Sequence, residues 1–259
     1  MASPKTAVAN TTPGKGTALV SWKDKMKGYA KEAAAVASET GGGGQFISVR
    51  AGQIQYNGAG VAGNKLDVIV VENVLENCYY EGEWDADNPQ PPVCFAFGRE
   101  SDEMSPHEKS AKPQHDTCHG CPNNEFGSAE KGKGKACKNI MRLALLPAKP
   151  LTNEAINKSE VAYMKLPVTS VKGFSAYVRR LNTLHELPPF AFITQIGAVP
   201  DAKTQFKVTF DDTEMIDDEE ILEALVLRHE EQSKEIMFAY SAPTEVEAPP
   251  PKKSPRKKF

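Results

Sequence analysis

A long polar segment interrupts a chain whose other patterns are mostly those of β-strands, and it limits the possible folds more than any other feature. Residues 99–138 have almost no apolar periodicity, although apolar runs precede and follow them. A loop of this length inside a domain is uncommon, and it is usually functional or organised by a metal. The segment contains a C-x2-C pair, Cys118 and Cys121, and a further cysteine, Cys137, after fifteen more residues. A bound metal ion would order it without a hydrophobic core.

Zinc is the metal that this cysteine pattern favours. A tetrahedral zinc site needs four soft ligands, and C-x2-C spacing lets one tight turn supply two of them. The expected ligands are Cys94, Cys118, Cys121 and Cys137. Three histidines remain alternatives to Cys94 as the fourth ligand: His107, His115 and His119. Because four protein ligands leave no open position for a reactive water, we expect the Zn2+ to be structural.

Two other interpretations of the cysteines and glycines are weaker. Residues 127–133, GSAEKGK, have the spacing of a phosphate-binding loop, but Gly134 stands where that loop requires a serine or threonine hydroxyl. The cysteines could also be reduced thiols without a metal. The fifth cysteine, Cys78, lies in an apolar run, which indicates a buried free thiol.

The composition indicates an ordinary soluble protein. The chain has 259 residues, of which 40% are hydrophobic and 25% are charged. It has no apolar run of the roughly 18 residues that a membrane span requires, so we expect no membrane association. The N-terminal residues lack the apolar core of a signal peptide, which indicates a cytoplasmic location. Cysteines in that compartment bind metal more often than they form disulfides.

Strand patterns and turn signals dominate the middle of the chain. The expected strands cover residues 46–58, 66–82, 91–98, 139–148, 162–170, 190–200 and 205–212, the last two as a hairpin. The run 68–71 is apolar throughout, which indicates a strand that is buried on both faces. Helix patterns occupy residues 170–184 and 217–240.

Many short strands with few helices predict a mainly β fold with α decorations, in the α+β class. We expect an OB-like small β-barrel (the oligonucleotide-binding type) with a zinc-knuckle insertion and a C-terminal amphipathic helix. Other small barrels and a sandwich fit the same pattern.

The chain is expected to divide into three parts. Residues 1–44 form a flexible segment with a short helix at 21–39, which ends before four glycines. Residues 45–240 form the OB-like domain, with the zinc-bearing insertion at about 94–138. Residues 241–259 form a disordered tail that is proline-rich and then basic.

Basic and aromatic residues near the cysteines point to single-stranded nucleic acid. Aromatic rings stack on unpaired bases, and lysines and arginines neutralise phosphates. Core packing remains the default role of several of these aromatic residues. The candidate contacts are Arg50, Tyr79, Tyr80, Trp84, Lys131, Lys133, Lys135, Lys138, Lys172, Arg179 and Arg180.

An acidic stretch lies near the end of the expected domain. We expect it to belong to a helix at residues 211–231, where carboxylates in the first turn interact favourably with the helix dipole. This helix could dock a replication or transcription protein, or compete with nucleic acid for basic groups. An ordinary charged surface helix explains it equally well.

Two stretches, YYEGEWDADNPQPPVCFAFG (79–98) and CHGCPNNEFGSAEKGKGKAC (118–137), resemble replication proteins encoded by bacteriophages. Across residues 45–240 the chain resembles phage single-stranded-DNA-binding proteins of the zinc-containing, helix-destabilising type. The resemblance implies an OB fold, structural zinc and sequence-independent binding of single strands in replication, recombination or repair, in the cytoplasm of a host bacterium. The chain differs from the T-even members in its all-cysteine candidate ligands and its basic C-terminus.

Three classes of function follow from these patterns. The first is a non-enzymatic single-stranded-DNA-binding protein, with RNA as a possible substitute for DNA. The second is a zinc-ribbon adaptor that binds a polymerase or another replication or transcription protein through the acidic helix. The third, an enzyme, has the least support, because no hydrolase, metalloprotease or deaminase motif is present. We therefore expect no catalytic residues.

Overall fold

The fold is described from a computed structural model, which covers residues 25–26, 29, 45–82, 90–202 and 204–240. The chain divides into two compact units, Met1–Gly43 and Gly44–Phe259. Of the first unit, the structure describes Lys25, Met26 and Tyr29, which are helical and exposed and belong to the helix expected at 21–39. The flexibility expected for the rest of residues 1–44 and the disorder expected for residues 241–259 concern parts of the chain that lie outside the described residues.

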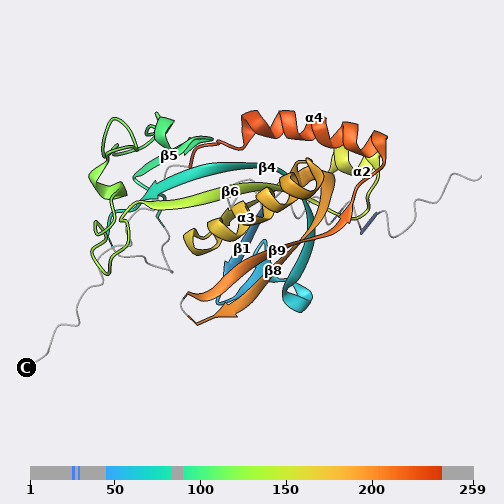
Figure 1. The fold of residues 1–259 in the computed structure, drawn as a ribbon, viewed down its shortest axis with the longest axis horizontal. Helices are drawn as coiled ribbons and strands as arrows, with labels where there is room; N and C mark the ends of the chain where they lie inside the picture. Colours follow the sequence, from blue (N-terminus) through green and yellow to red (C-terminus); the bar gives the residue numbers. More distant parts are fainter. Residues whose placement is uncertain (1–24, 27–28, 30–44, 83–89, 203, 241–259) are drawn as a thin grey trace, which may run out of the picture. The chain divides into compact units, whose positions relative to one another are not determined.

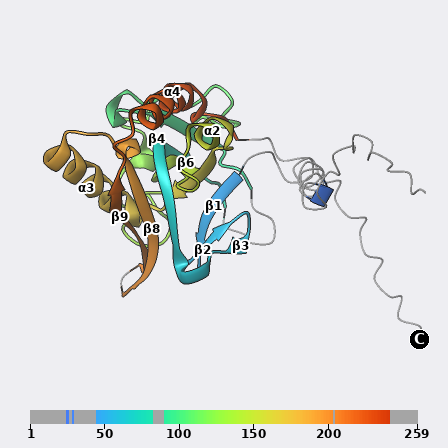
Figure 2. The same cartoon turned by 90° about the vertical axis from the view of Figure 1, so that its right-hand side faces the viewer.

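Nine strands of the second unit form one open sheet that curls into a half-barrel. Their order is β3-β2-β1-β7-β6-β4-β8-β9, with β5 paired to β4 beside this path. The strands are β1 (Gln45–Arg50), β2 (Gln53–Tyr56), β3 (Ala59–Gly60), β4 (Lys65–Tyr79), β5 (Cys94–Gly98), β6 (Lys138–Pro147), β7 (Ala162–Leu166), β8 (Phe192–Asp201) and β9 (Gln205–Met215). All pairs are antiparallel except β1 with β7. Figure 2 shows the two ends of the sheet, β8–β9 and β1–β3, on either side of β4.

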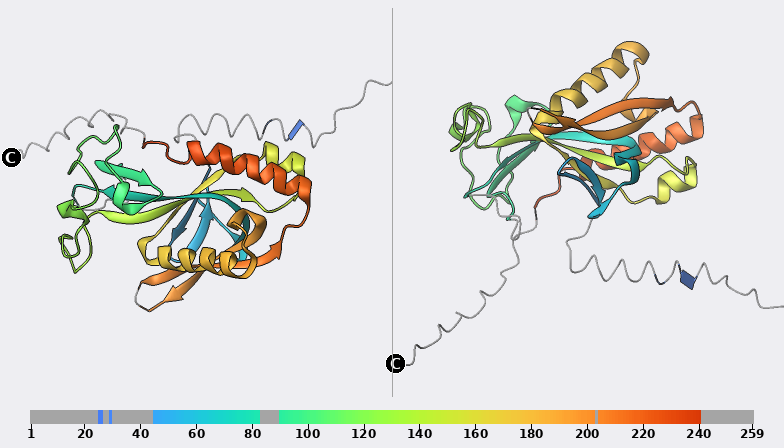
Figure 3. Two further views of the ribbon diagram at one scale, coloured as in Figure 1. Left: turned by 45° about the horizontal axis from the view of Figure 1, so that its top comes forward. Right: turned by 90° about the horizontal axis from the view of Figure 1, so that it is seen from below.

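Three α-helices cover the sheet within the part of the chain that the structure describes from residue 45 on. They are α2 (Asn153–Lys158), α3 (Val168–His185) and α4 (Glu219–Glu235). Helix α3 fills the inside of the curl, where Phe174, Tyr177 and Leu181 are buried. Helices α2 and α4 cover the outer face. In the left view of Figure 3, α3 and α4 lie on opposite sides of the long strands β4 and β6.

The long strand β4 explains why the apolar run 68–71 has no polar face. Val68 and Val70 belong to the inner core with α3, whereas Ile69 and Val71 belong to the outer core with α4. A bulge between Val70 and Glu72 then shifts the alternation by one residue. As a result, the later even-numbered side chains of β4 lie on the outer face; these are Glu72, Val74, Glu76 and Cys78.

The structure confirms the mainly β, α+β fold with a barrel-like curl, and it corrects the boundaries near the C-terminus. The expected acidic helix at 211–231 is wrong at its start, because Asp211, Asp212 and Glu214 lie in β9. These residues pair with β8, and strand pairing overrides their helix-favouring position beside an acidic helix start. Helix α4 also ends at Glu235, so residues 236–240 do not continue it. The short helix α2 was not expected.

The long polar segment connects the ends of two strands that flank the same neighbour. β5 and β6 both pair with the end of β4, where Tyr79 faces Cys94 and Cys78 faces Lys138. Between them, residues 99–137 contain two short 3-10 turns and no other helix or strand. Among the described residues, no helix is both long and apolar enough to cross a membrane.

Candidate metal centre and nucleic-acid interface

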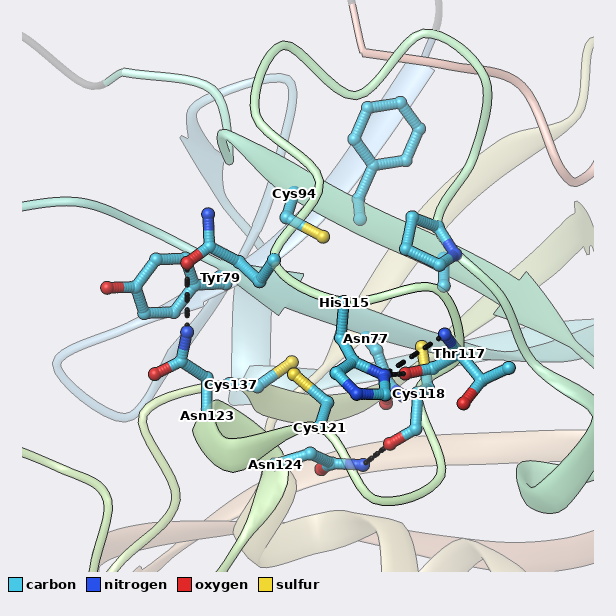
Figure 4. A pocket seen from close by; sticks show the side chains of 14 residues that line it. Asn77, Tyr79, Cys94, His115, Thr117, Cys118, Cys121, Asn123, Asn124 and Cys137 are labelled. Atoms are coloured by element: carbon cyan, nitrogen blue, oxygen red, sulfur yellow. Dashed lines mark hydrogen bonds between the residues drawn. The ribbon is translucent and has the colours of Figure 1, made fainter.

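The four cysteines expected to bind zinc line one cavity at the end of β4. Cys94 begins β5 and Cys137 immediately precedes β6, so pairing of both strands with β4 brings these two together. Cys118 and Cys121 reach the same place from the loop, and the Cys118 amide donates to the Met104 carbonyl at 2.8 Å. The cavity has a volume of about 20 Å3, the space of one small ion or water molecule. Figure 4 shows the four sulfur atoms around this space.

Backbone geometry closes the C-x2-C turn. Gly120 has φ of +75°, a left-handed conformation that a side chain would strain. The Asn124 amide hydrogen-bonds the Cys121 carbonyl at 2.8 Å, and the Asn124 side chain donates to the Cys118 carbonyl at 2.9 Å. The Cys137 amide donates to the Asn123 carbonyl at 2.8 Å, which ties the third cysteine to the same turn.

The four thiols are close enough to affect one another electrostatically. Burial, and then the charges of the other three cysteines, raise the pKa of Cys137 to about 12. Burial and the neighbouring thiolates Cys94 and Cys121 also raise the pKa of Cys118, against a hydrogen bond from Asn77 that lowers it. A bound cation would remove this penalty, because zinc binds thiolates and stabilises their charge.

The geometry fits a zinc ion only in part. Cys118, Cys121 and Cys137 are buried, and Cys94 is half-buried. Over the residues that the structure describes, no three Cys, His, Asp or Glu side chains are already arranged as a metal-binding group. The thiols therefore converge on one cavity without the close spacing of a formed tetrahedron. Their number and chemistry are those that a four-cysteine zinc site requires, but their spacing is not.

The histidine alternatives differ in position. Only His115 lines the cavity, and its Nδ1 lies 3.1 Å from the Thr117 carbonyl oxygen. His107 stacks on Phe95 with ring centroids 5.0 Å apart, and exposed His119 lies near Asp102. Cys78 is fully buried and free, as expected, and it does not line the cavity.

Asparagine side chains join the cysteine turn to the sheet. Asn139 on β6 donates to the Asn77 side chain at 2.5 Å and to that of Asn124 at 2.9 Å. Lys135 also donates to Asn124, at 3.2 Å. The sequence analysis did not identify these asparagines. Their three positions are far apart in sequence and carry no spacing that would reveal the network.

The lysine-bearing loop between Cys121 and Cys137, which we call the knuckle loop, is internally hydrogen-bonded. Gly134 accepts through its carbonyl from the amides of Gly127 at 2.9 Å and Ala129 at 3.2 Å, and the Ser128 hydroxyl accepts from Ala136 at 2.9 Å. The loop presents Lys131 and Lys133 exposed and Lys135 half-buried, with exposed Lys138 at the start of β6. The loop that carries Lys131, Lys133 and Lys135 thus begins and ends at cysteines of the cavity, and Lys138 follows it directly.

Phe126 is the interface candidate that sequence reasoning missed. Its side chain is 82% exposed, and the Lys135 ammonium lies 5.1 Å from its ring centroid. Exposed phenylalanine on a hydrogen-bonded loop is unusual, and an aromatic ring beside a cation is the arrangement that stacks on an unpaired base. The signal was present in the sequence, since Phe126 is the only aromatic residue in the polar segment 99–138.

The other predicted contacts lie in different places. Tyr79 lines the cysteine cavity, whereas burial and the nearby Cys78 and Glu76 raise the pKa of half-buried Tyr80. Trp84 lies outside the described residues. Arg50 ends β1, and the group on α3 consists of exposed Lys172, Arg179 and Arg180, the last paired with Asp212. The structure therefore gathers the knuckle lysines and Tyr79 but places Arg50 and the α3 group on other elements.

Comparisons with protein-family models, with curated proteins and with solved structures found no match for this chain.

Proposed function

We propose that this protein binds single-stranded DNA without sequence preference, through an OB-type barrel whose knuckle loop is held by a structural Zn2+. The observation that carries the proposal is the convergence of four cysteines on one cavity, next to a loop that presents Phe126 and three lysines, with Lys138 directly after it. We also propose that the protein acts in replication, recombination or repair of the phage type, as the resemblance implies.

The strand order supports an OB-type barrel. In such a barrel five strands form a curled sheet, and the first strand pairs with the second and the fourth. Here β4 has that central position, with β6 and β7 on one side and β8 and β9 on the other. Helix α3 follows the third of these strands. In this correspondence the β1–β2 hairpin extends the sheet beyond β7, and the knuckle segment is the loop between the first and second barrel strands.

The correspondence also predicts a binding face. Oligonucleotides bind OB folds across the second and third strands and against the loops after the first and fourth. These are β6, β7, the segment 80–137 and the short turn between β8 and β9. The knuckle loop with Phe126 thus lies where the fold type expects ligand contacts.

A zinc ion would be held by Cys94, Cys118, Cys121 and Cys137, as a covalent-like cross-link of the two strand ends and the loop. Four thiolate ligands supply no reactive water, so its role would be to order the loop. Nucleic-acid contacts then fall to the chain's own residues. Phe126 would stack on a base, and the lysines would neutralise phosphates with release of counterions.

The direct test measures binding by fluorescence anisotropy. The full chain is titrated with labelled oligo-dT, the matching duplex and oligo-rU, and the protein is assayed for zinc. We expect tight binding to oligo-dT, weak binding to the duplex, and one zinc per chain. The oligo-rU arm decides between DNA and RNA. No binding to either single strand, with a folded protein, would refute the proposal.

Two variant sets locate the interface. Substitution of Lys131, Lys133 and Lys135 with alanine removes three charges from the loop, whereas substitution of Lys149, Lys158 and Lys234 removes three charges elsewhere. We expect oligo-dT affinity to fall at least about tenfold for the first set and little for the second. A third set, Lys172 and Arg179 to alanine, reports on α3. A loss confined to that set would move the interface to α3.

A partner-binding adaptor is the second candidate, and α4 favours it. Val226 and Leu227 are 41% and 63% exposed, and with Glu219, Leu222 and Glu223 they line a shallow groove. An apolar stripe between carboxylates suits a basic amphipathic partner segment. Leu227→Asp would abolish such binding and leave oligo-dT affinity unchanged, whereas the knuckle lysine variant would do the reverse.

A further inference from the structure

The residues after α4 cross the outer face of the sheet beside β5, where Figure 1 shows the chain running from the end of α4 toward β5. We call residues 236–240 the C-terminal strap. Phe238 packs on Tyr163 of β7 with ring centroids 4.8 Å apart, and Tyr240 packs on Phe95 of β5 at 5.0 Å. The strap therefore covers the outer side of β5, β6 and β7.

Two cationic side chains of the sheet, Arg142 and Lys165, contact the strap. The Arg142 guanidinium on β6 lies between the rings of Phe238, at 4.1 Å, and Phe97, at 4.4 Å. Its Nη1 donates to the carbonyls of Ile236 at 3.0 Å and Phe238 at 2.9 Å. Lys165 on β7 lies 3.9 Å from the centroid of the Tyr240 ring, and its ammonium donates to the Tyr240 hydroxyl at 2.7 Å.

The charged side chains beneath the strap are paired only in part with one another. Arg142 directs Nε and Nη2 to the Glu76 carboxylate, at 2.8 and 3.1 Å. Its Nη1 points to the strap instead, and the Tyr240 hydroxyl of the strap also donates to the Glu76 carboxylate. Together, Arg142 and Lys165 bring two positive charges against one carboxylate, which leaves a surface that attracts an anionic ligand.

The chemical groups of the strap resemble those of a single strand of nucleic acid. The strap places two aromatic rings, two residues apart, against aromatic and cationic side chains, where bases would stack. It places carbonyl oxygens on the Arg142 guanidinium, where phosphate oxygens would accept. The covered strands β6 and β7 are also those on which an OB-type barrel binds oligonucleotides.

We propose that the outer face of β5–β7 is a base-stacking subsite for single-stranded DNA, formed by Phe97, Arg142, Tyr163 and Lys165, and that the strap occupies it in the free protein. This inference rests on the proposed function. Single-stranded DNA enters the subsite only when Phe238 and Tyr240 leave it. The measured dissociation constant therefore exceeds the intrinsic one by the inverse of the fraction of molecules with the strap displaced.

The first test removes the competing rings in the full chain. Phe238→Ala with Tyr240→Ala should tighten oligo-dT binding about fivefold or more, because a larger fraction of molecules has the subsite open. Tyr56→Ala is the matched control, since Tyr56 and Phe238 are similarly exposed, at 38% and 36%, and Tyr56 lies on β2. Lys165→Ala, in the background of the double substitution, should reverse part of the gain. Unchanged or weaker binding by a double variant that melts cooperatively overturns the inference.

A second measurement does not depend on a destabilising variant. With fluorophenylalanine incorporated at position 238, the 19F resonance should move from a packed to a solvent-exposed position as oligo-dT is added. A resonance that stays unchanged at saturation overturns the inference. If the wild-type chain and the double variant both fail to bind, the proposed function fails with it. If the wild-type chain binds oligo-dT and the knuckle lysine variant does not, the proposed function is supported. An unchanged 19F resonance at position 238 would then refute the further inference and leave the proposed function intact.

Discussion

The Phe126 side chain is exposed to solvent in the knuckle loop, beside the Lys135 ammonium. Stacking of one base on an aromatic side chain contributes about 1–3 kcal/mol. We therefore predict that Phe126→Ala weakens oligo-dT binding about 5- to 160-fold, the range that this energy covers. Anisotropy titrations measure the change.

The aromatic replacement is the control for this residue. Phe126→Trp should keep the affinity, and its fluorescence should be quenched when oligo-dT binds. The melting temperature and zinc content should not change in either variant, because the ring has few contacts to lose. Equal affinities for Phe126→Ala and the wild type would remove this residue from the interface.

Glu76 and Arg142 form an ion pair in which both side chains are almost completely buried. Removing one partner of such a pair usually costs about 3–5 kcal/mol, because the other charge is left buried and unpaired. We predict a loss of this size in the free energy of unfolding for Glu76→Gln at neutral pH, measured by urea denaturation. Glu154→Gln is the control, since the Glu154–Lys158 pair is exposed and should contribute less than about 1 kcal/mol.

The same pair predicts a pH dependence. Burial alone would raise the pKa of Glu76, but Arg142, Lys165 and the Tyr240 hydroxyl outweigh it, so that the pKa lies below the ordinary 4.5 of a glutamate. A carboxyl with a lowered pKa stabilises the fold above its unfolded pKa, and the stabilisation is lost as the pH falls through the folded value. The difference between wild type and Glu76→Gln should therefore shrink below about pH 4.5. A difference that is constant between pH 7 and pH 3 would contradict this assignment.

At the scale of elements, the knuckle loop depends on strands that are not its sequence neighbours. The pairings of β5 and β6 with β4 bring Cys94 and Cys137 together, and the C-x2-C turn then closes the cavity. We predict that Cys118→Ser lowers the zinc content from about one per chain to nearly none, because three thiolates and a hydroxyl bind zinc far more weakly. Amides of the loop, such as Gly127 and Cys137, should then exchange faster with deuterium.

Cys78→Ser is the control for the metal prediction. Cys78 is equally buried but lies outside the cavity, with its Sγ 3.1 Å from the Tyr240 hydroxyl. The zinc content should therefore stay at one per chain. The hairpin β8–β9 should keep its exchange protection in both variants. Equal zinc contents in Cys118→Ser and the wild type would show that the cavity is not the metal site.

At the scale of the whole molecule, charge is segregated although the formal net charge is only −3. The lysines gather at the knuckle, whereas β9 and the start of α4 are acidic. Each phosphate neutralised on a single strand contributes about 0.7 to the slope of log affinity against log salt. Alanine at Lys131, Lys133 and Lys135 should therefore reduce the slope by about 2. The set at Lys149, Lys158 and Lys234 should leave it unchanged, and equal effects of the two sets would indicate non-specific attraction.

Local patterns were sufficient for the elements whose formation depends on neighbouring residues. Alternation and turn residues predicted the β8–β9 hairpin, and the apolar run 68–71 predicted a strand buried on both faces, because the side-chain period of a strand is visible in a few residues. The C-x2-C pair likewise indicated a tight turn. Local pattern failed at residues 211–215, where pairing with β8 outweighed the acidic helix-start signal.

The sequence by itself therefore determined the strand-rich class, the hairpin and the set of cysteines that meet. Only the tertiary structure decided which distant side chains contact one another. The bulge in β4 turns Glu76 toward Arg142, 66 residues away, and the end of α4 at Glu235 brings Phe238 onto the same arginine. Such contacts depend on sheet order and on the path of the chain after a helix. Those are set by the packing of distant segments, and no local periodicity records them.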